Sequence, residues 1–488
     1  MTVSEIITAV DNFAWGPVLI IFSLGCGLLF SIALKFPQIR LFKQMLNCSF
    51  KNKKANSGLT PFQALSIAIG GRVGTGNITG TASAIMFGGP GAVFWMCVMA
   101  VICSASAYIE SALAQVWKRR VNGEYAGGPS FYMDKGLKCK PIAAFYGIVS
   151  VVFLIIFAGV QTNAFSSVAS SSYRIPPMAI AVCYTLLLIV VIFGGAKVIA
   201  GVADKVVPFM SVAYVGVALL LILINITKVP SMIALIFTSA FSANAVFGGM
   251  VGSAVSWGVR RGVFSNEAGL GTGAWVAGCA DVSHPAKAGL SQAFSVFISL
   301  MILVTNSYNV VQGDGTQVVS HISGNYDVFV TEAINTAVNG FGFIFITVAM
   351  FLFTFTTIMA YSMYLSRIYY YFFSNRINNP IVKFINIGIN VATIILAFVG
   401  PLVSSTTIWN LASALCGLLS LVNLACLGLL YKPGISTLRD YEEQLKRGVD
   451  PVFIPERCGI QGAELWHTII AEDYADELKA YKQAFPDE

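Results

Sequence analysis

Long apolar runs alternate with short polar connections along nearly the whole chain. A run of about 20 apolar residues has the length of a helix that crosses a bilayer. The pattern predicts an all-α polytopic membrane protein with about eleven transmembrane helices. We expect these spans at residues 18–35, 61–88, 91–117, 142–167, 178–193, 207–226, 247–279, 290–311, 341–373, 381–399 and 409–431.

Two of these spans are interrupted by glycines and small polar residues. Residues 70–80 (GGRVGTGNITG) break the second span, and residues 258–273 (GVRRGVFSNEAGLGTG) break the seventh. Open backbone at membrane depth survives only where it faces protein, water or a ligand. Glycines can also mark close helix packing, but those of the first break do not share one helical face. We therefore interpret the first break as a binding site that contains the Thr75 hydroxyl and the Asn77 amide.

Lys and Arg are distributed unequally between alternate loops. One set of loops carries only Arg174 and Lys228. The other set carries the basic residues at 35–54, 118–140, 197–205, 287 and 376–383. Because cytoplasmic loops are enriched in Lys and Arg, this asymmetry predicts an external N-terminus and a cytoplasmic C-terminus. The basic loops also account for the net charge of +7, so no nucleic-acid partner is needed.

The two broken spans lie five spans apart and run in opposite directions in this topology. Such a pair is typical of a secondary transporter built from inverted repeats. It predicts an extra N-terminal helix with a basic loop (1–60), a first five-helix repeat (61–228), a second, inverted repeat (229–432) and a cytoplasmic tail (433–488). Within that tail, residues 459–488 show helical periodicity, and we expect an amphipathic helix that packs on the transporter.

Composition argues against several other classes of protein. Residues are 56% hydrophobic and 11% charged, whereas soluble domains carry about 25% charged residues. The ten cysteines lie mostly in apolar spans and the three histidines are scattered, so neither a disulfide framework nor a metal site is indicated. No nucleophile–base pair or phosphate loop suggests an enzyme. A channel is also not indicated, because it would need pore-lining rings, normally from several subunits, whereas this chain has an internally repeated architecture.

Charged residues inside the spans are expected to be functional, because burying a charge in a membrane is costly. Arg72 lies near the middle of its span and needs an anionic partner, for which Glu110 and Glu267 are the candidates. We interpret this group as a gate or structural clamp in preference to a catalytic dyad. The other candidates for functional charges at membrane depth are Arg260, Arg261 and Asp281.

Two pairs of polar residues have alternative interpretations. Thr356 and Thr357 either donate hydrogen bonds to their own helix or supply oxygens to a cation. Gln161 and Asn163 either link helices or bind substrate. In a site of this kind, half-helix N-termini hold a carboxylate and unwound carbonyls hold Na⁺, an arrangement that suits a zwitterionic amino acid.

Several motifs, in the same order, resemble those of the alanine/glycine:cation symporter family (sodium:alanine symporters). The resemblance extends from about residue 10 to about residue 432. The motifs are residues 71–78 (GRVGTGNI), 88–96 (GGPGAVFWM), 127–129 (GGP), 159–163 (GVQTN) and 261–269 (RGVFSNEAG). The resemblance implies a leucine-transporter-like fold and uptake of a small neutral amino acid coupled to Na⁺ or H⁺. It also implies the plasma (inner) membrane of a prokaryote.

The resemblance also implies roles for individual residues. Thr75 and Gly76 would meet the substrate carboxylate with help from Gln161, and the substrate pocket would further include Asn77, Phe264, Ser265 and Asn266. Thr356 and Thr357 would complete a cation site with backbone carbonyls near Gly71 and Gly74.

One departure from the family falls beside this pocket. The family usually has tryptophan where this chain has Tyr361, four residues after Thr357 on the same helical face. We therefore expect Tyr361 to border the pocket. The resulting prediction is Na⁺-coupled symport of alanine or glycine by alternating access, with membrane lipid as the surroundings and no cofactor besides the coupling ion. The alternative is a Na⁺-independent or H⁺-coupled carrier of the same fold, for a substrate as large as glutamine. The oligomeric state is left open, a monomer included.

Overall fold

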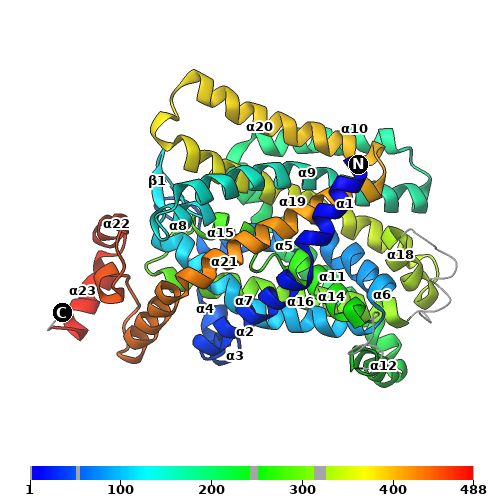
Figure 1. The fold of residues 1–488 in the computed structure, drawn as a ribbon, viewed down its shortest axis with the longest axis horizontal. Coiled ribbons are helices and arrows are strands. Elements are labelled where there is room, and N and C mark those ends of the chain that lie inside the picture. Colours follow the sequence, from blue (N-terminus) through cyan, green and yellow to red (C-terminus); the bar gives the residue numbers. More distant parts are fainter. Residues whose placement is uncertain (1–2, 51–54, 242–250, 313–325, 487–488) are drawn as a thin grey trace.

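The computed structural model describes residues 3–50, 55–241, 251–312 and 326–486, and nearly all its elements are helices (Figure 1). The expected span 247–279 extends beyond these ranges, and so does the polar outer loop that the sequence predicts at residues 312–339. The α-helices up to the second break are α1 (Val3–Ala14), α2 (Pro17–Ala33), α3 (Pro37–Arg40), α4 (Phe42–Phe50), α5 (Pro61–Arg72), α6 (Thr81–Gly88), α7 (Gly91–Val116), α8 (Pro129–Lys135), α9 (Lys140–Tyr173), α10 (Pro177–Phe193), α11 (Gly195–Ile224), α12 (Val229–Phe241) and α14 (Val251–Asn266). The later α-helices are α15 (Thr272–Ala277), α16 (Pro285–Gln312), α18 (Tyr326–Ala337), α19 (Phe341–Phe373), α20 (Pro380–Val399), α21 (Ser405–Lys446), α22 (Leu465–Asp473) and α23 (Ala475–Ala484).

The remaining elements are short. A two-stranded antiparallel sheet joins β1 (Arg119–Val121) to β2 (Glu124–Ala126). The other helical turns are the π-helix η1 (Gly76–Gly80) and the 3₁₀ turns η2 (Ile226–Lys228), η3 (Ser374–Arg376), η4 (Gly400–Leu402) and η5 (Pro455–Cys458).

Eight helices among the described residues are long and apolar enough to cross a membrane. They correspond in position to eight of the predicted spans. The shorter apolar helix α10 and the two interrupted helices, α5–α6 and α14–α15, occupy the positions of the other three. The prediction of an all-α polytopic membrane protein is therefore confirmed. The number of crossings and the division into two inverted repeats remain predictions.

The sequence defines where the first interrupted helix begins. Pro61 occupies the first turn of α5, where its missing N–H is not needed. The Thr60 hydroxyl accepts a hydrogen bond from the Gln63 N–H, and the Gln63 side chain accepts one from the Thr60 N–H, both at 3.1 Å. This capping box fixes the start of the helix.

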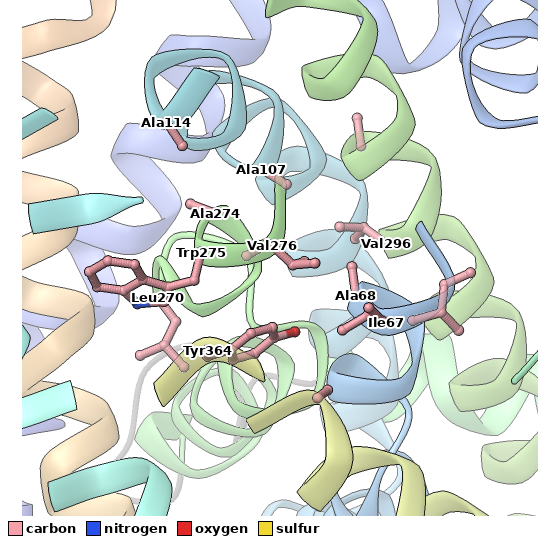
Figure 2. Close-up of a cluster of buried hydrophobic side chains, with 14 of the residues drawn as sticks. Ile67, Ala68, Ala107, Ala114, Leu270, Ala274, Trp275, Val276, Val296 and Tyr364 are labelled. Atoms are coloured by element: carbon pink, nitrogen blue, oxygen red, sulfur yellow. The ribbon is translucent and has the colours of Figure 1, made fainter. Parts of the chain in front are cut away.

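The helices pack around the second break through apolar side chains. Figure 2 shows Ile67 and Ala68 of α5 near Val276 of α15 and Val296 of α16, with Tyr364 of α19 on another side. Such packing of small and branched side chains is typical of helices that associate in a membrane. Large apolar side chains on α10, α11 and α20 are instead exposed, and we infer that they face lipid.

Two groups of short elements lie at opposite ends of the helix bundle (Figure 1). The helices α12 and α18 lie at one end, and the β-hairpin, α8, α22 and α23 lie at the other. Residues 231–241 are too short to span a membrane, so the sequence predicts a short interfacial helix there, at the position of α12. It does not predict α4, α18 or the hairpin. Strands of three residues are too short to produce a recognisable alternation of apolar and polar positions.

Candidate substrate and ion site

The first break separates α5 from α6 in the middle of the bundle. α5 ends at Arg72, Val73 and Gly74 are not helical, and the chain then forms the π-helix η1. π-Helical turns are rare and occur frequently at functional sites. Every residue from Ala64 to Ile85 is buried, so the polar backbone of this break faces protein or a ligand.

The second break uses left-handed backbone. α14 ends at Asn266, and α15 begins at Thr272. Between them Gly269 and Gly271 have φ values of 86° and 90°, which glycine adopts without a steric penalty. Glu267 has φ of 50°, which is uncommon for a residue other than glycine and is often associated with a functional site.

The two breaks touch each other. A Cβ atom at Gly76 would lie 2.9 Å from Cα of Ser265 and 3.3 Å from Cδ1 of Phe264, so a larger residue at position 76 would force the breaks apart. Three buried polar side chains gather here: Thr75, Ser265 and Asn266. Within the described residues, the Thr75 hydroxyl, the Ser265 hydroxyl and both amide atoms of Asn266 have no hydrogen-bond partner. An unpaired buried polar group costs about 1–3 kcal/mol, so this cluster is suited to a polar ligand.

The amides of α9 have different contacts. Gln161 Oε1 accepts a 3.2 Å hydrogen bond from the Thr75 N–H and therefore supports the first break directly. Asn163 Nδ2 donates to the carbonyls of Gly400 and Val403, at 2.8 and 3.0 Å. Asn163 thus links α9 to η4, whereas Gln161 belongs to the site.

The threonine pair of α19 lies against the end of α5. Thr357 Oγ1 donates hydrogen bonds to the carbonyls of Gly70 and Phe353, both at 2.8 Å. A Cβ atom at Gly74 would lie 2.7 Å from this same hydroxyl oxygen. Thr356 Oγ1 bonds to carbonyls of its own helix. The hydroxyl of Thr357 therefore lies among backbone oxygens of the first break, and that of Thr356 lies one residue away along α19.

Gly71 lies beside this pair but faces another side chain. A Cβ atom at Gly71 would lie 2.4 Å from the hydroxyl oxygen of Tyr364. The backbone of α5 can approach α19 this closely only because position 71 has no side chain.

A buried charge cluster lies on the other side of the breaks. Arg72 Nη1 donates to the carbonyl of Asn266 at 3.3 Å, and Arg72 Nη2 lies 3.8 Å from Glu110 Oε1. Glu267 accepts hydrogen bonds from Tyr361, at 2.6 Å, and from Thr272, at 2.8 Å. The cluster contains two carboxylates and one guanidinium, all nearly inaccessible to water.

Aromatic rings surround Phe264 at the end of α14. Its ring stacks on Trp409 of α21, with centroids 5.4 Å apart, and meets Phe157 of α9 edge-on at 4.9 Å. Phe157 in turn lies 5.6 Å from Tyr361. These rings form an apolar wall beside Thr75 and Gly76, of the kind that limits the size of a bound side chain.

Asn77 contacts α16. Its Nδ2 donates to the hydroxyl and the carbonyl of Ser299 in α16, at 2.8 and 3.0 Å. Asn306, also in α16, donates to the carbonyl of Asn77 at 2.9 Å. The structure thus brings together most of the predicted residues and places the Asn77 side chain against α16.

Sequence reasoning did not select several residues that contact the breaks. Asn423 Nδ2 donates to the carbonyl of Gly269 at 2.9 Å and to Glu110 at 3.2 Å. Asn306 and Asn423 are amides in apolar spans, which is the same signal that selected Gln161. Phe157 and Trp409 gave no such signal, because aromatic residues are common in apolar spans.

The fold and the site together define an all-α membrane protein with two interrupted helices that meet at a buried polar centre. Its relation to known proteins agrees with this description. The chain belongs to the sodium:alanine symporter family, whose model matches residues 1–455. The resemblance inferred from the motifs is therefore confirmed, and the family is one of transporters.

Individual relatives match nearly the whole chain. YrbD of Bacillus subtilis (strain 168), whose name describes a sodium/proton-dependent alanine carrier, is 40% identical over 475 residues, which are 95% of this chain and 97% of YrbD. GlnT of the same organism, whose name describes a sodium/glutamine symporter, is 35% identical over 95% of this chain and 96% of GlnT. A crystal structure of MhsT in complex with L-phenylalanine matches 88% of this chain and 99% of that chain, with 13% identity and a TM-score of 0.48.

Proposed function

We propose that this protein is a Na⁺-coupled symporter of a small neutral amino acid that works by alternating access, and that it is not an enzyme. The observation that carries the proposal is a group of polar side chains where the breaks meet, Thr75, Ser265 and Asn266, which have no hydrogen-bond partner in the part of the chain that the structure describes. Membership of the sodium:alanine symporter family and the names of YrbD and GlnT support the same function.

The substrate would bind between the two breaks. Its carboxylate would accept hydrogen bonds from the Thr75 hydroxyl and from backbone N–H groups near Gly76. Gln161 holds the Thr75 N–H and so orients this part of the site. The side chain of the substrate would face the aromatic wall formed by Phe264, Phe157 and Trp409, which favours a small or apolar group.

The coupling ion would lie between the end of α5 and α19. Na⁺ is a hard cation that prefers oxygen ligands. Thr357 Oγ1 lies 2.8 Å from the Gly70 carbonyl, so the two oxygens are close enough to share one ion. The Thr356 hydroxyl and the carbonyls of Gly71 and Gly74 would complete its coordination. Binding of Na⁺ would fix the first break in the form that binds substrate, and this coupling would make uptake depend on Na⁺.

In this proposal the tail and the basic loops are cytoplasmic, and the protein lies in the plasma membrane of a prokaryote. The interrupted helices α5–α6 and α14–α15 would each begin one inverted repeat, at residues 61–228 and 229–432. Contact between Gly76 and Ser265 supports this arrangement, because it places the two breaks together as an inverted repeat requires.

A second candidate is a proton-coupled carrier of the same fold. The observation that favours it is a pair of buried carboxylates: Glu110 lies 3.8 Å from the guanidinium of Arg72, and Glu267 accepts hydrogen bonds from the hydroxyls of Tyr361 and Thr272. A buried carboxylate without a counter-charge is costly, and a proton would remove that charge. In this candidate the driving gradient would be one of H⁺ and the requirement for Na⁺ would be absent.

Uptake by proteoliposomes tests both candidates. Radiolabelled alanine, glycine and glutamine would be supplied with an inward Na⁺ gradient, or with choline in place of Na⁺ and an inward H⁺ gradient. We expect Na⁺-stimulated uptake that is lost in Thr75→Val and Gln161→Ala. Thr81→Val is the matched control, because the Thr81 hydroxyl bonds within its own turn, to the Asn77 carbonyl at 2.8 Å.

Equal uptake in choline under an H⁺ gradient would replace the first candidate with the second. Absence of uptake of all three amino acids would contradict both.

A further inference from the structure

The two interrupted helices are connected a second time, at the end of the bundle that carries the basic loops. The Leu59 N–H donates to the carbonyl of Cys279 at 3.0 Å, and the Asp281 N–H donates to the carbonyl of Leu59 at 2.8 Å. A backbone bridge thus joins the segment before α5 to the segment after α15. Gly58 packs so closely that a Cβ atom there would lie 2.5 Å from the Cys279 carbonyl oxygen. These contacts hold the two segments together.

The carboxylate of Asp281 adds further hydrogen bonds between these two segments. Its Oδ2 accepts hydrogen bonds from the N–H groups of Asn56 and Ser57, at 2.8 and 3.2 Å. Its Oδ1 accepts one from the Tyr474 hydroxyl at 2.9 Å. Asp281 is buried, so these donors replace the water that a carboxylate needs. One side chain therefore joins the segment before α5, the segment after α15 and the C-terminal tail.

The tail is anchored independently of Asp281. The indole N–H of Trp466 in α22 donates to the carbonyls of Gln115 and Val116, at 3.1 and 3.2 Å, which satisfies the free end of α7. Asp473, at the end of α22, accepts hydrogen bonds from Tyr125 at 3.1 Å and from Asn56 at 3.0 Å. The family model ends at residue 455, so α22 and α23 lie beyond the part of the chain that it matches.

We propose that Asp281 is the gating residue that holds the cytoplasmic side of the site closed, and that the tail restrains opening through the Tyr474 hydroxyl bonded to it. The proposal extends the alternating-access function given above. Opening to the cytoplasm requires Asn56 to Leu59 to separate from Cys279 and Asp281. While the tail is bound, Tyr474 and Asp473 keep both of these segments in place, so the tail acts as an intramolecular brake on substrate release.

Removal of the Tyr474 hydroxyl should change the fraction of protein in the open state by a measurable amount. In Tyr474→Phe, Asp281 loses one of its charge-assisted donors in the closed state, whereas in the open state water supplies that donor. The closed state is therefore weakened relative to the open state. Hydrogen bonds to charged groups are strong enough that we expect the open fraction to rise about tenfold.

Cys279 provides a direct measurement of opening. Its thiol is buried and donates to the carbonyl of Trp275, and the segment around Gly58 covers its backbone in the closed state. The full-length protein would be treated with N-ethylmaleimide, and the modification of the Cys279 peptide would be followed by mass spectrometry. Other cysteine-containing peptides from the same sample serve as internal references.

Tyr474→Phe and Asp281→Asn are the test variants, and Tyr481→Phe is the matched control. The Tyr481 hydroxyl accepts a hydrogen bond from Arg457 at 2.7 Å within the tail, away from Asp281. We expect Cys279 to be modified about tenfold faster in Tyr474→Phe and faster still in Asp281→Asn, and at the wild-type rate in Tyr481→Phe. A wild-type rate in Tyr474→Phe, or the same increase in Tyr481→Phe, would overturn the brake.

A transport measurement separates a gating effect from general loosening. Uptake of radiolabelled alanine should show a higher maximal rate in Tyr474→Phe with an unchanged KM, because the site itself is intact. A raised KM would assign the effect to the site and overturn the gating role. Thiol modification needs no substrate, so failure of every uptake assay would contradict the proposed function and leave the test of the gate standing.

Discussion

Thr357 Oγ1 donates a 2.8 Å hydrogen bond to the carbonyl of Gly70, which links the middle of α19 to the last turn of α5. This carbonyl belongs to the last turn of α5, so the hydroxyl connects an intact helix to an interrupted one. Movement of either helix changes the separation of these two oxygens. An ion that both oxygens bind would therefore be sensitive to the same movement.

The pair predicts how Na⁺ dependence responds to mutation. Thr357→Val keeps the shape of the side chain and removes its oxygen, so we expect the Na⁺ concentration for half-maximal uptake to rise at least about tenfold. Thr354→Val is the control, because the Thr354 hydroxyl lies 2.8 Å from the Tyr184 hydroxyl on another face of α19. The dependence of uptake on Na⁺ concentration measures both. An unchanged dependence in Thr357→Val would exclude this hydroxyl as a ligand.

We expect two substitutions in the charge cluster to destabilise the protein by different amounts. Arg72→Met leaves Glu110 and Glu267 without their counter-charge, and removing one partner of a buried pair typically costs about 3–5 kcal/mol. Glu110→Gln leaves Arg72 with the remaining carboxylate, so its cost should be smaller. Thermal unfolding of the purified protein measures this difference. Equal destabilisation by the two substitutions would show that Glu267 does not share the guanidinium.

The hydrogen bond between Tyr361 and Glu267 can be tested by mutation at position 361, where the family usually has tryptophan. Tyr361→Phe removes the donor that lies 2.6 Å from Glu267, and we expect a loss of stability of about 1–3 kcal/mol. Tyr361→Trp retains an N–H donor and should be less destabilised. Thermal unfolding compares the two variants. A more stable phenylalanine variant would mean that ring shape, and not the hydrogen bond, determines the residue at this position.

The surroundings of Lys118 lead us to expect that binding of the tail to the helix bundle depends on pH. Its ammonium lies over the rings of Tyr125 and of Trp466 in the tail, 4.1 and 4.4 Å from their centroids. Burial lowers the pKa of Lys118 from 10.5 to about 7, although Asp281 and the nearby Asp473 and Cys279 partly oppose the shift and Arg120 adds to it. When the tail dissociates, water reaches Lys118 and its pKa returns toward the ordinary value.

The sign of the effect follows from proton uptake. Between pH 7 and 10.5 the dissociated form binds more protons than the docked form, so docking becomes stronger as the pH rises through this interval. Amide hydrogen exchange in α22, corrected for the intrinsic effect of pH, should show protection that increases from pH 7 to higher values. In Lys118→Met this increase should disappear. The same increase in the variant would assign the effect to another group.

The sequence was sufficient to predict the helical membrane fold and the two breaks, because long apolar runs and clustered glycines are local signals. It also selected Thr75, Gln161 and Ser265, whose polar side chains are conspicuous within apolar surroundings. The placement of each side chain was not predictable in this way. Asn77 lies in the break, yet its amide contacts Ser299 of α16, and only the packing of distant helices decides that direction.

Other parts of the site gave no local signal at all. Phe157 and Trp409 resemble any other aromatic residue in a membrane span, and their role depends on their contact with Phe264. Asp281 was recognisable as a costly charge, but its link to Tyr474 joins positions 193 residues apart. Contacts over such separations depend on the whole fold and cannot be deduced from local periodicity.

The N-terminal helix has a consequence for the synthesis of the protein. Asp11 pairs with Arg260, 249 residues later, and the indole N–H of Trp15 donates to the carbonyl of Ser413, 398 residues later. At about 5–20 residues per second, the ribosome needs roughly 12–50 s to make the partner of Asp11. During that interval α1 and α2 have been made but lack these contacts. Asp11 and Trp15 therefore form these contacts only after much of the later chain has been made.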